Sequence, residues 1–254
     1  MPGRAEGGVT PAIFNYTRQN HHPIEDPTLP QWLQLMLDSL PALLWAGLTF
    51  TVPLTLLSFV LGLSLGLLTA VTRLFAATPL RWLARFYVWI FRGTPLLVQL
   101  FVIFYGLPSI GILLDAFPAA LIGFTLNVGA YSSEIVRAAI QSVPRGQWEA
   151  GYSIGMSWSQ VMRRTILPQA TRVSVPPLSN TFISLVKDTS LAAAITVPEM
   201  FQTAQRIVAT TYEPLILYIE AAIIYLALSS VLSQLQVRLE KRFERYGGYL
   251  EART

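Results

Sequence analysis

Arg145-Gly-Gln-Trp-Glu-Ala-Gly-Tyr-Ser-Ile-Gly155 is a polar, glycine-containing stretch that lies between two hydrophobic parts of the chain, and Leu167-Pro168 follows it. An insert of this length cannot bury a hydrophobic core of its own. We therefore expect it to dock onto another protein. The stretch favours a membrane subunit that is driven by a partner over an enzyme that acts alone.

The local sequence predicts two short helices in this insert. Residues 149–155 indicate a helix that ends in a glycine-relieved turn, and residues 158–166 indicate a second helix. Pro168 disfavours helical geometry at Leu167, so we expect a break there. Two short helices joined at a glycine would form a rigid protrusion that can enter a groove and transmit a partner's motion.

The composition is that of a polytopic membrane protein. Of the 254 residues, 53% are hydrophobic and 13% are charged, and the mean hydropathy is +0.49. Soluble domains carry about 25% charged residues. The chain has no cysteine, which excludes disulfides, thiolate metal sites and cysteine nucleophiles.

Segments almost free of charge predict an all-α membrane domain at residues 39–237. Each is long enough to cross the roughly 30 Å hydrocarbon layer. Lys187-Asp188 interrupts the fourth, and Glu220 lies near the start of the fifth. The five predicted transmembrane helices are 39–72, 93–114, 116–133, 173–197 and 214–237.

The lysine and arginine distribution predicts that the N-terminus lies outside and the C-terminus inside. With five spans, residues 1–38 form an external tail and residues 238–254 a cytoplasmic one. The tail has no apolar run of signal-peptide length, and residues 31–38 indicate a short helix in the outer interface.

With this topology, the external segments hold only Arg4, Arg18 and Arg206 among the basic residues. Cytoplasmic segments hold Arg73, Arg81, Arg85, Arg137, Arg145, Arg163, Arg164, Arg172, Arg238, Lys241, Arg242, Arg245 and Arg253. The basic pI of about 9.5 is therefore mostly a result of topology, and nucleic-acid binding is not expected.

Two glycine features bear on packing. Gly62 and Gly66 form a small-xxx-small pair, which either allows a close helix contact or reflects ordinary glycine usage in membrane helices. Arg92-Gly-Thr-Pro95 predicts a break where the second span begins, because proline is tolerated at an early helical position.

The residues needed for several kinds of catalysis are missing. No glycine precedes a lysine, so a Walker A phosphate loop is absent and this chain cannot hydrolyse ATP by that machinery. The two histidines, His21 and His22, are adjacent in the tail and do not suit a helical zinc site. We therefore expect neither an enzyme nor a metal site.

Several motifs in order resemble a known family. The stretch from Arg145 to Gly155, with Leu167-Pro168-Gln169-Ala170, resembles the EAA loop of permease subunits of bacterial ABC importers. Four further motifs resemble the polar amino-acid branch of these permeases. These motifs are Phe91-Arg-Gly-Thr-Pro-Leu-Leu-Val-Gln-Leu100, Tyr131-Ser-Ser-Glu134, Pro176-Pro-Leu-Ser-Asn180 and Phe182-Ile-Ser-Leu-Val-Lys-Asp-Thr-Ser-Leu191. Within the branch, Arg81-Trp-Leu-Ala-Arg-Phe86 and residues 183–190 are most similar to cystine permeases.

The resemblance implies a function and a set of partners. The chain would form the transmembrane pathway of an ATP-driven importer in the bacterial inner membrane. Its cargo would be L-cystine or another polar amino acid such as glutamine, glutamate, arginine or histidine. Two ABC ATPase subunits would bind ATP and Mg, a second permease copy or similar chain would complete the pathway, and an extracytoplasmic solute-binding protein would deliver the cargo. The alternatives are a secondary transporter that works without an ATPase, and a membrane scaffold that transports nothing.

The same resemblance places the ATPase-coupling residues in a loop at about residues 141–172. Gly151 stands where the family usually has alanine, which weakens a helix by up to about 1 kcal/mol, and Thr165 stands where an apolar residue is common. Both departures leave the docking inference standing. The implied coupling residues are Arg145, Gly146, Gln147, Glu149, Ala150, Gly151 and Gly155.

Polar residues within the spans are candidates for the substrate pathway, because a charge inside a membrane helix is expensive unless it faces protein or water. Lys187 and Asp188, with Thr189 and Ser190, would either form a cavity wall that meets a zwitterionic amino acid or fix helix packing as a buried ion pair. Asn127 and Tyr131 lie one turn apart on the third predicted span. They would either line a cavity or bond to a neighbouring helix.

Three further charged residues indicate a gating or structural role. Glu134 lies three residues before Arg137, a spacing that allows a salt bridge on one helix face. Because this pair lies at the cytoplasmic end of the third predicted span, we expect a structural or gating contact and not a substrate contact. Arg92 joins this group from the start of the second predicted span.

Overall fold

The structure is a computed structural model that describes residues 29–245. The chain divides into two units, residues 1–38 and 39–254. In the described part of the first unit, the chain is helical from Gln31, and Gln34 Nε2 donates to the carbonyl of Leu29 at 3.1 Å. Most of the predicted external tail, with His21 and His22, lies outside the described residues, as does the end of the predicted cytoplasmic tail.

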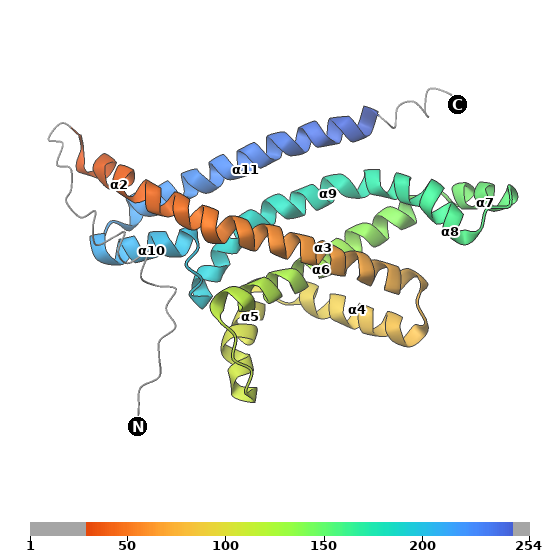
Figure 1. Ribbon diagram of the computed structural model, residues 1–254, viewed down its shortest axis with the longest axis horizontal. Helices are drawn as coiled ribbons and strands as arrows, with labels where there is room; N and C mark the ends of the chain where they lie inside the picture. The colour runs from red at the N-terminus through yellow and green to blue at the C-terminus, as the bar shows by residue number, and fades with distance from the viewer. Residues whose placement is uncertain (1–28, 246–254) are drawn as a thin grey trace. The chain divides into compact units, whose positions relative to one another are not determined.

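The described residues are helical and contain no strand, as the composition predicts. Short connections join the helices, and the path of the second unit can be followed in Figure 1. The α-helices are α2 (Gln31–Ala46), α3 (Val52–Phe75), α4 (Thr78–Gly93), α5 (Leu96–Phe101), α6 (Ala116–Ser142), α7 (Arg145–Ser153), α8 (Trp158–Val161), α9 (Leu167–Asp188), α10 (Met200–Thr211) and α11 (Pro214–Arg245). Three π segments, η1 (Gly47–Thr51), η2 (Val102–Gly106) and η4 (Met162–Ile166), and two 3₁₀ segments, η3 (Leu107–Ile110) and η5 (Thr189–Ile195), complete the set.

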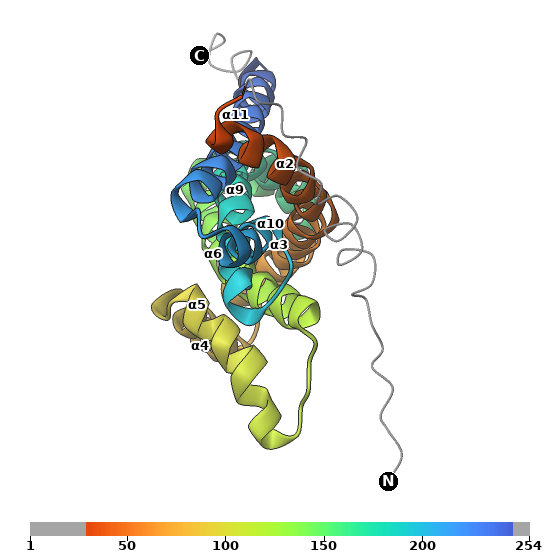
Figure 2. The same cartoon turned by 90° about the vertical axis from the view of Figure 1, so that its left-hand side faces the viewer.

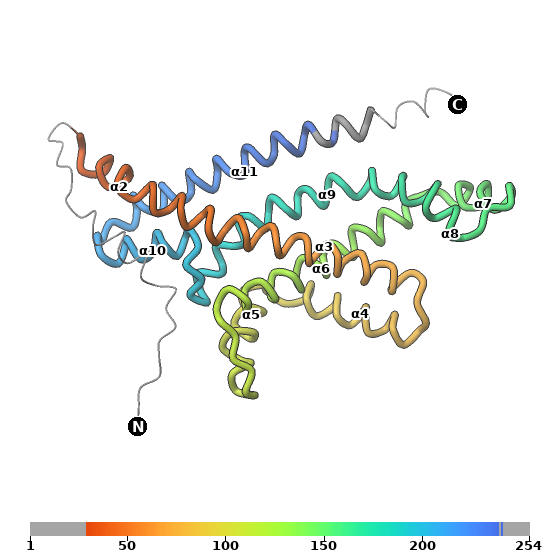
Figure 3. Tube along the Cα trace, in the orientation of Figure 1, coloured from red at the N-terminus to blue at the C-terminus, as the bar shows by residue number. Residues whose placement is uncertain are grey.

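The π segments explain how prolines are accommodated. Each ends one residue before an X-Pro pair: Val52-Pro53, Leu107-Pro108 and Leu167-Pro168. The residue before the proline donates its N–H five residues back, as Leu167 does to the carbonyl of Met162. This wider turn makes room for a ring that would otherwise clash with the carbonyl four residues earlier. The predicted break at Leu167-Pro168 is therefore wrong, and the chain continues as a helix from α8 through η4 into α9 (Figure 3).

The first predicted span is a helix, and it is longer than the sequence indicates. Residues 31–38 belong to α2, which continues to Ala46 and then through η1 into α3, so they are not a separate short helix. The whole run, Gln31–Phe75, is long and apolar enough to cross a membrane. A helix cannot be ended by Asp38 alone, because a single polar residue neither breaks the backbone ladder nor supplies a turn.

The second predicted span begins earlier than residue 93. Arg92-Gly-Thr-Pro95 is a break, as predicted, but it separates two helical pieces that are bent by 108°. Thr78–Gly93 and Leu96–Ile110 together pass as one broken span. The segment with Arg81 and Arg85, expected to be a cytoplasmic connection, is the helix α4, and only residues 76 and 77 separate it from α3. Figure 2 shows α4 and α5 to one side of the other helices of the second unit.

Three helices of the described chain are long and apolar enough to span a membrane, or four if the bent pair counts as one. They are Gln31–Phe75, Ala116–Ser142 and Pro214–Arg238. The fourth predicted span corresponds to α9 and η5, which are helical but more polar. A helix of this kind needs protein or water around its polar face.

The pairing of α3 with α6 is the most extensive helix contact. A Cβ atom at Gly62 would lie 2.7 Å from Val128 Cβ, and one at Gly66 would lie 2.8 Å from Ser132 Cβ. The small-xxx-small interpretation is thus confirmed, since the two glycines let the helix backbones approach closely. In Figure 1, α7 and α8 lie at the opposite end of the bundle from α10.

Candidate functional site

The insert between α6 and α9 folds as a helical hairpin, which we call the coupling hairpin (residues 145–166). Its first helix, α7, ends in a turn at Gly155, whose φ is +79°. Gly155 N donates to the Tyr152 carbonyl at 2.9 Å, and Met156 N donates to the Gly151 carbonyl at 3.1 Å. These two bonds form a Schellman motif, in which glycine is the residue that adopts the left-handed conformation without strain.

The second helix of the coupling hairpin begins with a capping box. Gln160 N donates to Ser157 Oγ at 3.4 Å, and Ser157 N donates to Gln160 Oε1 at 2.8 Å. Both exchanged bonds satisfy N–H groups that a helix start leaves without partners. The predicted pair of short helices joined at a glycine is therefore present, with the first helix starting at Arg145.

The coupling hairpin is fixed to the bundle by its inner face. Trp148 and Met156 pack against a buried cluster that includes Ala70, Val136 and Ile166. Gln169 Nε2 on α9 donates to Gln147 Oε1 at 3.3 Å. Such packing allows a push on the hairpin to move α6 and α9 with it.

Gly151 has a packing role that the sequence did not indicate. It is buried, and a Cβ atom there would lie 2.7 Å from Val161 Cγ2 across the hairpin. An alanine at this position would improve helix propensity but would clash with the second helix. The small residue therefore keeps α7 and α8 in close contact.

The outer face of the coupling hairpin is available to a partner. Glu149, Ala150 and Gly155 are exposed, and the large side chains of Tyr152, Ile154 and Trp158 are exposed beside them. Aromatic and aliphatic side chains among polar neighbours are typical of the centre of a docking surface. Arg145 and Gly146 are also exposed.

A cavity of about 470 Å³ lies between α6, α9, the start of η5 and the break that joins α4 to α5. Its lining is partly apolar, and we call it the polar cavity after the polar side chains that it contains. Asn127 and Tyr131 line it from α6, and Asp188 lines it from the end of α9. The structure thus brings together three of the six candidate pathway residues. The polar side chains around the cavity are those of Thr94, Asn127, Tyr131, Asn180, Thr181, Ser184 and Asp188.

The other three candidates lie beside the cavity. Thr189 is buried, and its hydroxyl donates to the Val186 carbonyl at 2.7 Å. The hydroxyl of Ser190 donates to the Lys187 carbonyl at 2.7 Å, and the Lys187 side chain is exposed. Among the side chains that the structure describes, no ion pair joins Lys187 to Asp188, and the three ion pairs all involve Glu134.

Gln99 holds the wall of the cavity at the break between α4 and α5. Its Nε2 donates to the carbonyls of Phe91 at 2.9 Å and Thr94 at 3.1 Å, and to the hydroxyl of Thr94 at 2.9 Å. Its Oε1 accepts from Asn127 Nδ2 at 3.0 Å. Asn127 therefore both lines the cavity and bonds to a neighbouring helix, so the two interpretations of this residue hold together.

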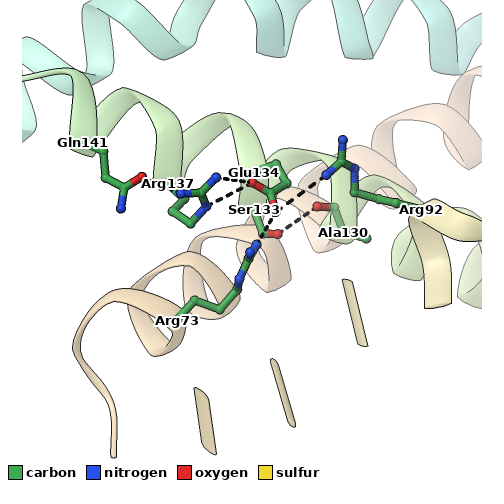
Figure 4. Close-up of polar contacts among 7 residues, drawn as sticks. All are labelled: Arg73, Arg92, Ala130, Ser133, Glu134, Arg137 and Gln141. Carbon is green, nitrogen blue, oxygen red and sulfur yellow. Dashed lines mark hydrogen bonds and ion pairs between the residues drawn. The ribbon is translucent and has the colours of Figure 1, made fainter. Parts of the chain in front are cut away.

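Glu134 is the centre of a cluster with three arginines (Figure 4). Its Oε1 accepts from Arg73 at 2.6 Å, and its Oε2 accepts from Arg137 at 2.7 and 3.0 Å. Arg92 is more distant, at 3.6 Å from Oε1. The predicted pair with Arg137 is confirmed, and Arg137 also donates to Gln141. The cluster ties α3, α4 and α6 together.

Another acid, Glu199, lies where α10 begins. It is fully buried, accepts from the backbone N–H groups of Phe201 at 2.9 Å and Gln202 at 2.7 Å, and accepts from the hydroxyl of Tyr225 at 2.8 Å. Burial raises the pKa of Glu199, and the bonds from the backbone partly offset that rise. An N-capping role explains this acid without any part in the cavity.

Sequence reasoning missed Arg73, Gln99, Asn180 and Ser184. Arg73 reaches Glu134 across 61 positions, and Gln99 reaches Asn127 across 28, so no local spacing marks either contact. Asn180 and Ser184 lie one turn apart and a further turn before Asp188, which is a helical signal that would have found them.

Comparison with known proteins identifies the family. Residues 62–245 match the family described as the binding-protein-dependent transport system inner membrane component. The chain belongs to this family. It is the permease of an ABC importer, a membrane subunit with no catalytic role of its own.

Individual relatives of this permease are similar over most of their length. It is 55% identical to the L-cystine transport system permease protein TcyB of Bacillus subtilis, over 84% of this chain and 91% of that one. It is 44% identical to the arginine transport system permease protein ArgU of Corynebacterium glutamicum, over 77% of this chain and 66% of that one. A crystal structure of an amino acid ABC transporter with histidines superposes with a TM-score of 0.80 at 34% identity, covering 84% of this chain and 99% of the solved one.

Proposed function

We propose that this permease forms the transmembrane pathway for a polar amino acid and that the amino acid is L-cystine. The observation that supports L-cystine as the substrate is the 55% identity to the cystine permease TcyB, which extends over 84% of the chain. The polar cavity supports an amino-acid cargo, since it holds the carboxylate of Asp188 and several neutral hydrogen-bonding groups. A zwitterion needs both charged and neutral partners when it leaves water.

Arginine is the second candidate substrate. The similarity to ArgU, at 44% identity, and the acidic side chain in the cavity favour it. Glutamine, glutamate and histidine are further candidate substrates, and a transport assay would distinguish among them. A secondary transporter without an ATPase is disfavoured, because the exposed coupling hairpin would then have no partner.

The proposed topology has five spans in the bacterial inner membrane, with the N-terminus outside and the C-terminus inside. The spans are residues 39–75, the bent pair Thr78–Gly93 with Leu96–Ile110, then α6 up to residue 140, residues 173–195 within α9 and η5, and residues 214–237 within α11. Residues 39–237 make up the transmembrane domain, flanked by an external tail at 1–38 and a cytoplasmic tail at 238–254. This order is supported by the arginines of the coupling loop (141–172), which then lie on the cytoplasmic side.

The mechanism follows from the position of the coupling hairpin. Two ATPase subunits bind ATP and Mg and receive the hairpins of two permease chains in grooves, through Glu149, Ala150 and the turn at Gly155. Their closure moves the hairpins, and the packing of Trp148 and Gln147 carries the motion into α6 and α9. The cavity then opens alternately to each side, and a solute-binding protein delivers the cargo outside.

An uptake assay tests the substrate. Vesicles carrying the permease with its ATPase and binding protein are given, in separate assays, labelled L-cystine, glutamine, glutamate, arginine or histidine. We expect ATP-dependent uptake that is selective for cystine. Uptake of another amino acid would discard cystine and keep the amino-acid importer. Absence of uptake for the whole panel would refute the proposed cargo class.

A further inference from the structure

The cluster around Glu134 carries more positive than negative charge. Three guanidinium groups face one carboxylate, and among the side chains that the structure describes no other acid lies within ion-pair distance of them. Arg73 and Arg137 make the short bonds to Glu134, whereas Arg92 stands at 3.6 Å and shares an oxygen with Arg73. The charge of Glu134 is therefore already satisfied without Arg92.

Arg92 is also the most accessible member of the cluster. Its side chain is 45% exposed, against 13% for Arg73 and 30% for Arg137. In Figure 4 its guanidinium approaches Glu134 from the side opposite Arg137. Guanidinium groups present five donors in a fixed fork, so Arg92 retains donors for a further acceptor.

The position of Arg92 links the cluster to the cavity. Its guanidinium carbon lies 5.4 Å from the centre of the Tyr131 ring, and Tyr131 lines the cavity. Thr94, two residues further along the chain, lines the cavity too. On α6, Asn127, Tyr131 and Glu134 follow one another at spacings of four and three, on one face of the helix. The cluster thus continues the α6 wall of the cavity by about one helical turn.

The cavity and the cluster together match both charges of an amino acid. Asp188 lines the cavity from α9 and offers a carboxylate to an ammonium group. Arg92 offers a guanidinium, which pairs with carboxylates through two parallel hydrogen bonds. Neither Arg92 nor Lys187 is part of the cavity lining, but the guanidinium of Arg92 lies over the ring of Tyr131, which is.

We infer that Arg92 is the residue that binds the α-carboxylate of the transported amino acid, and that it leaves Glu134 to do so. The inference rests on the proposed amino-acid cargo. Release of Arg92 breaks only a long contact, and Glu134 stays paired with Arg73 and Arg137. Arg92 lies in the last turn of α4, next to the break at Thr94-Pro95. Its release from Glu134 on occupancy of the cavity would therefore also remove a contact between α4 and α6.

Binding of an amino acid and of its decarboxylated amine to the permease–ATPase complex tests this role. The measurement uses purified complex in detergent without the binding protein, with L-cystine and cystamine as probes. The ratio of their dissociation constants reports recognition of the carboxylate alone. We expect the wild-type complex to prefer cystine and Arg92→Gln to reduce that preference by about 10- to 100-fold.

Arg85→Gln is the matched control, since it removes the same charge from an exposed site on the same helix and should leave the ratio unchanged. Arg92→Met keeps the apolar length of the side chain and carries the same expectation as Arg92→Gln if the latter does not assemble. An unaltered ratio in the Arg92 variants, with both ligands weakened equally, would give Arg92 a structural role and overturn the inference.

The wild-type measurement separates this inference from the proposed function. If wild type binds arginine, glutamine or histidine in place of cystine, the cystine assignment fails. The same ratio is then measured with agmatine, 4-aminobutanamide or histamine, and it decides the role of Arg92. If wild type binds none of these amino acids, the proposed cargo class fails and the inference fails with it.

Discussion

The coupling hairpin and the polar cavity are built in opposite ways. In the hairpin, the bonds that shape each turn join residues three to five positions apart, as in the Schellman motif at Gly155 and the capping box at Ser157. In the cavity and in the Glu134 cluster beside it, the bonds that hold the walls join residues far apart in the chain, as Gln99 to Asn127 and Arg73 to Glu134. The hairpin can therefore move as one body, whereas the cavity depends on how several helices are placed.

This difference has a functional consequence. A lever that passes on a partner's motion must keep its own shape, and local bonds achieve that. A pathway that opens and closes must let its walls separate, and contacts between helices can be exchanged when they do. Substitutions in the cavity walls should therefore have larger effects on assembly than substitutions in the hairpin.

The largest effect is expected for Glu134→Gln. The change leaves three guanidinium groups close together without a negative charge, at a site that is 20% exposed. We expect a loss of about 2–4 kcal/mol in the free energy of unfolding, discounted for partial exposure. Thermal unfolding of the purified permease in detergent measures it. Arg92→Gln removes the long contact to Glu134 and the cation–π contact with Tyr131, both at an exposed site, and should cost about 1 kcal/mol or less. Equal losses in both variants would contradict the account of the cluster.

Gln99→Leu should rank second. Gln99 is 7% exposed, and its loss leaves the amide of Asn127 and the carbonyl of Phe91 without this partner. The expected cost is about 1–3 kcal/mol of stability. Gln169→Leu removes a hydrogen bond between the hairpin and α9 at a more exposed site, so it should cost about 1 kcal/mol or less. A larger loss for Gln169→Leu would reverse the contrast between the two regions.

The turn of the hairpin gives a sharper local test. Gly155→Ala places a side chain at a φ of +79°, which costs about 1–2 kcal/mol even though nothing lies within 4 Å of the new methyl group. Gly146→Ala adds the same methyl group in equally open space within α7 and should stabilise by up to about 1 kcal/mol. Unfolding and co-purification of the ATPase are measured for both. Equal behaviour of the two variants would show that the left-handed turn is not required.

The smallest net effect is expected at Gly151. Gly151→Ala gains up to about 1 kcal/mol of helix propensity but forces the new methyl group against Val161, at a cost of about 1–3 kcal/mol. We expect a net loss of about 1 kcal/mol. A double variant with Val161→Ala should recover the part that comes from the clash. If the single variant is more stable than wild type, the close contact of α7 with α8 does not limit the size of the side chain at position 151.

The sequence predicted the local features well and the long-range features poorly. The glycine turn at Gly155, the break at Arg92-Gly-Thr-Pro95 and the pair of Glu134 with Arg137 all depend on neighbours in the chain. The helix through Pro168 was missed, because a π segment compensates for a proline and leaves no composition signal of its own. The partnership of Gln99 with Asn127 depends on helix placement, which no spacing rule encodes.

The central claim is that an ATPase drives this permease through the coupling hairpin. The most direct test is uptake of labelled L-cystine into vesicles that contain the permease and its binding protein, with and without the ATPase. The account predicts ATP-dependent uptake with the ATPase and none without it. Uptake that persists at the same rate without the ATPase would contradict the claim, because the chain would then transport by itself.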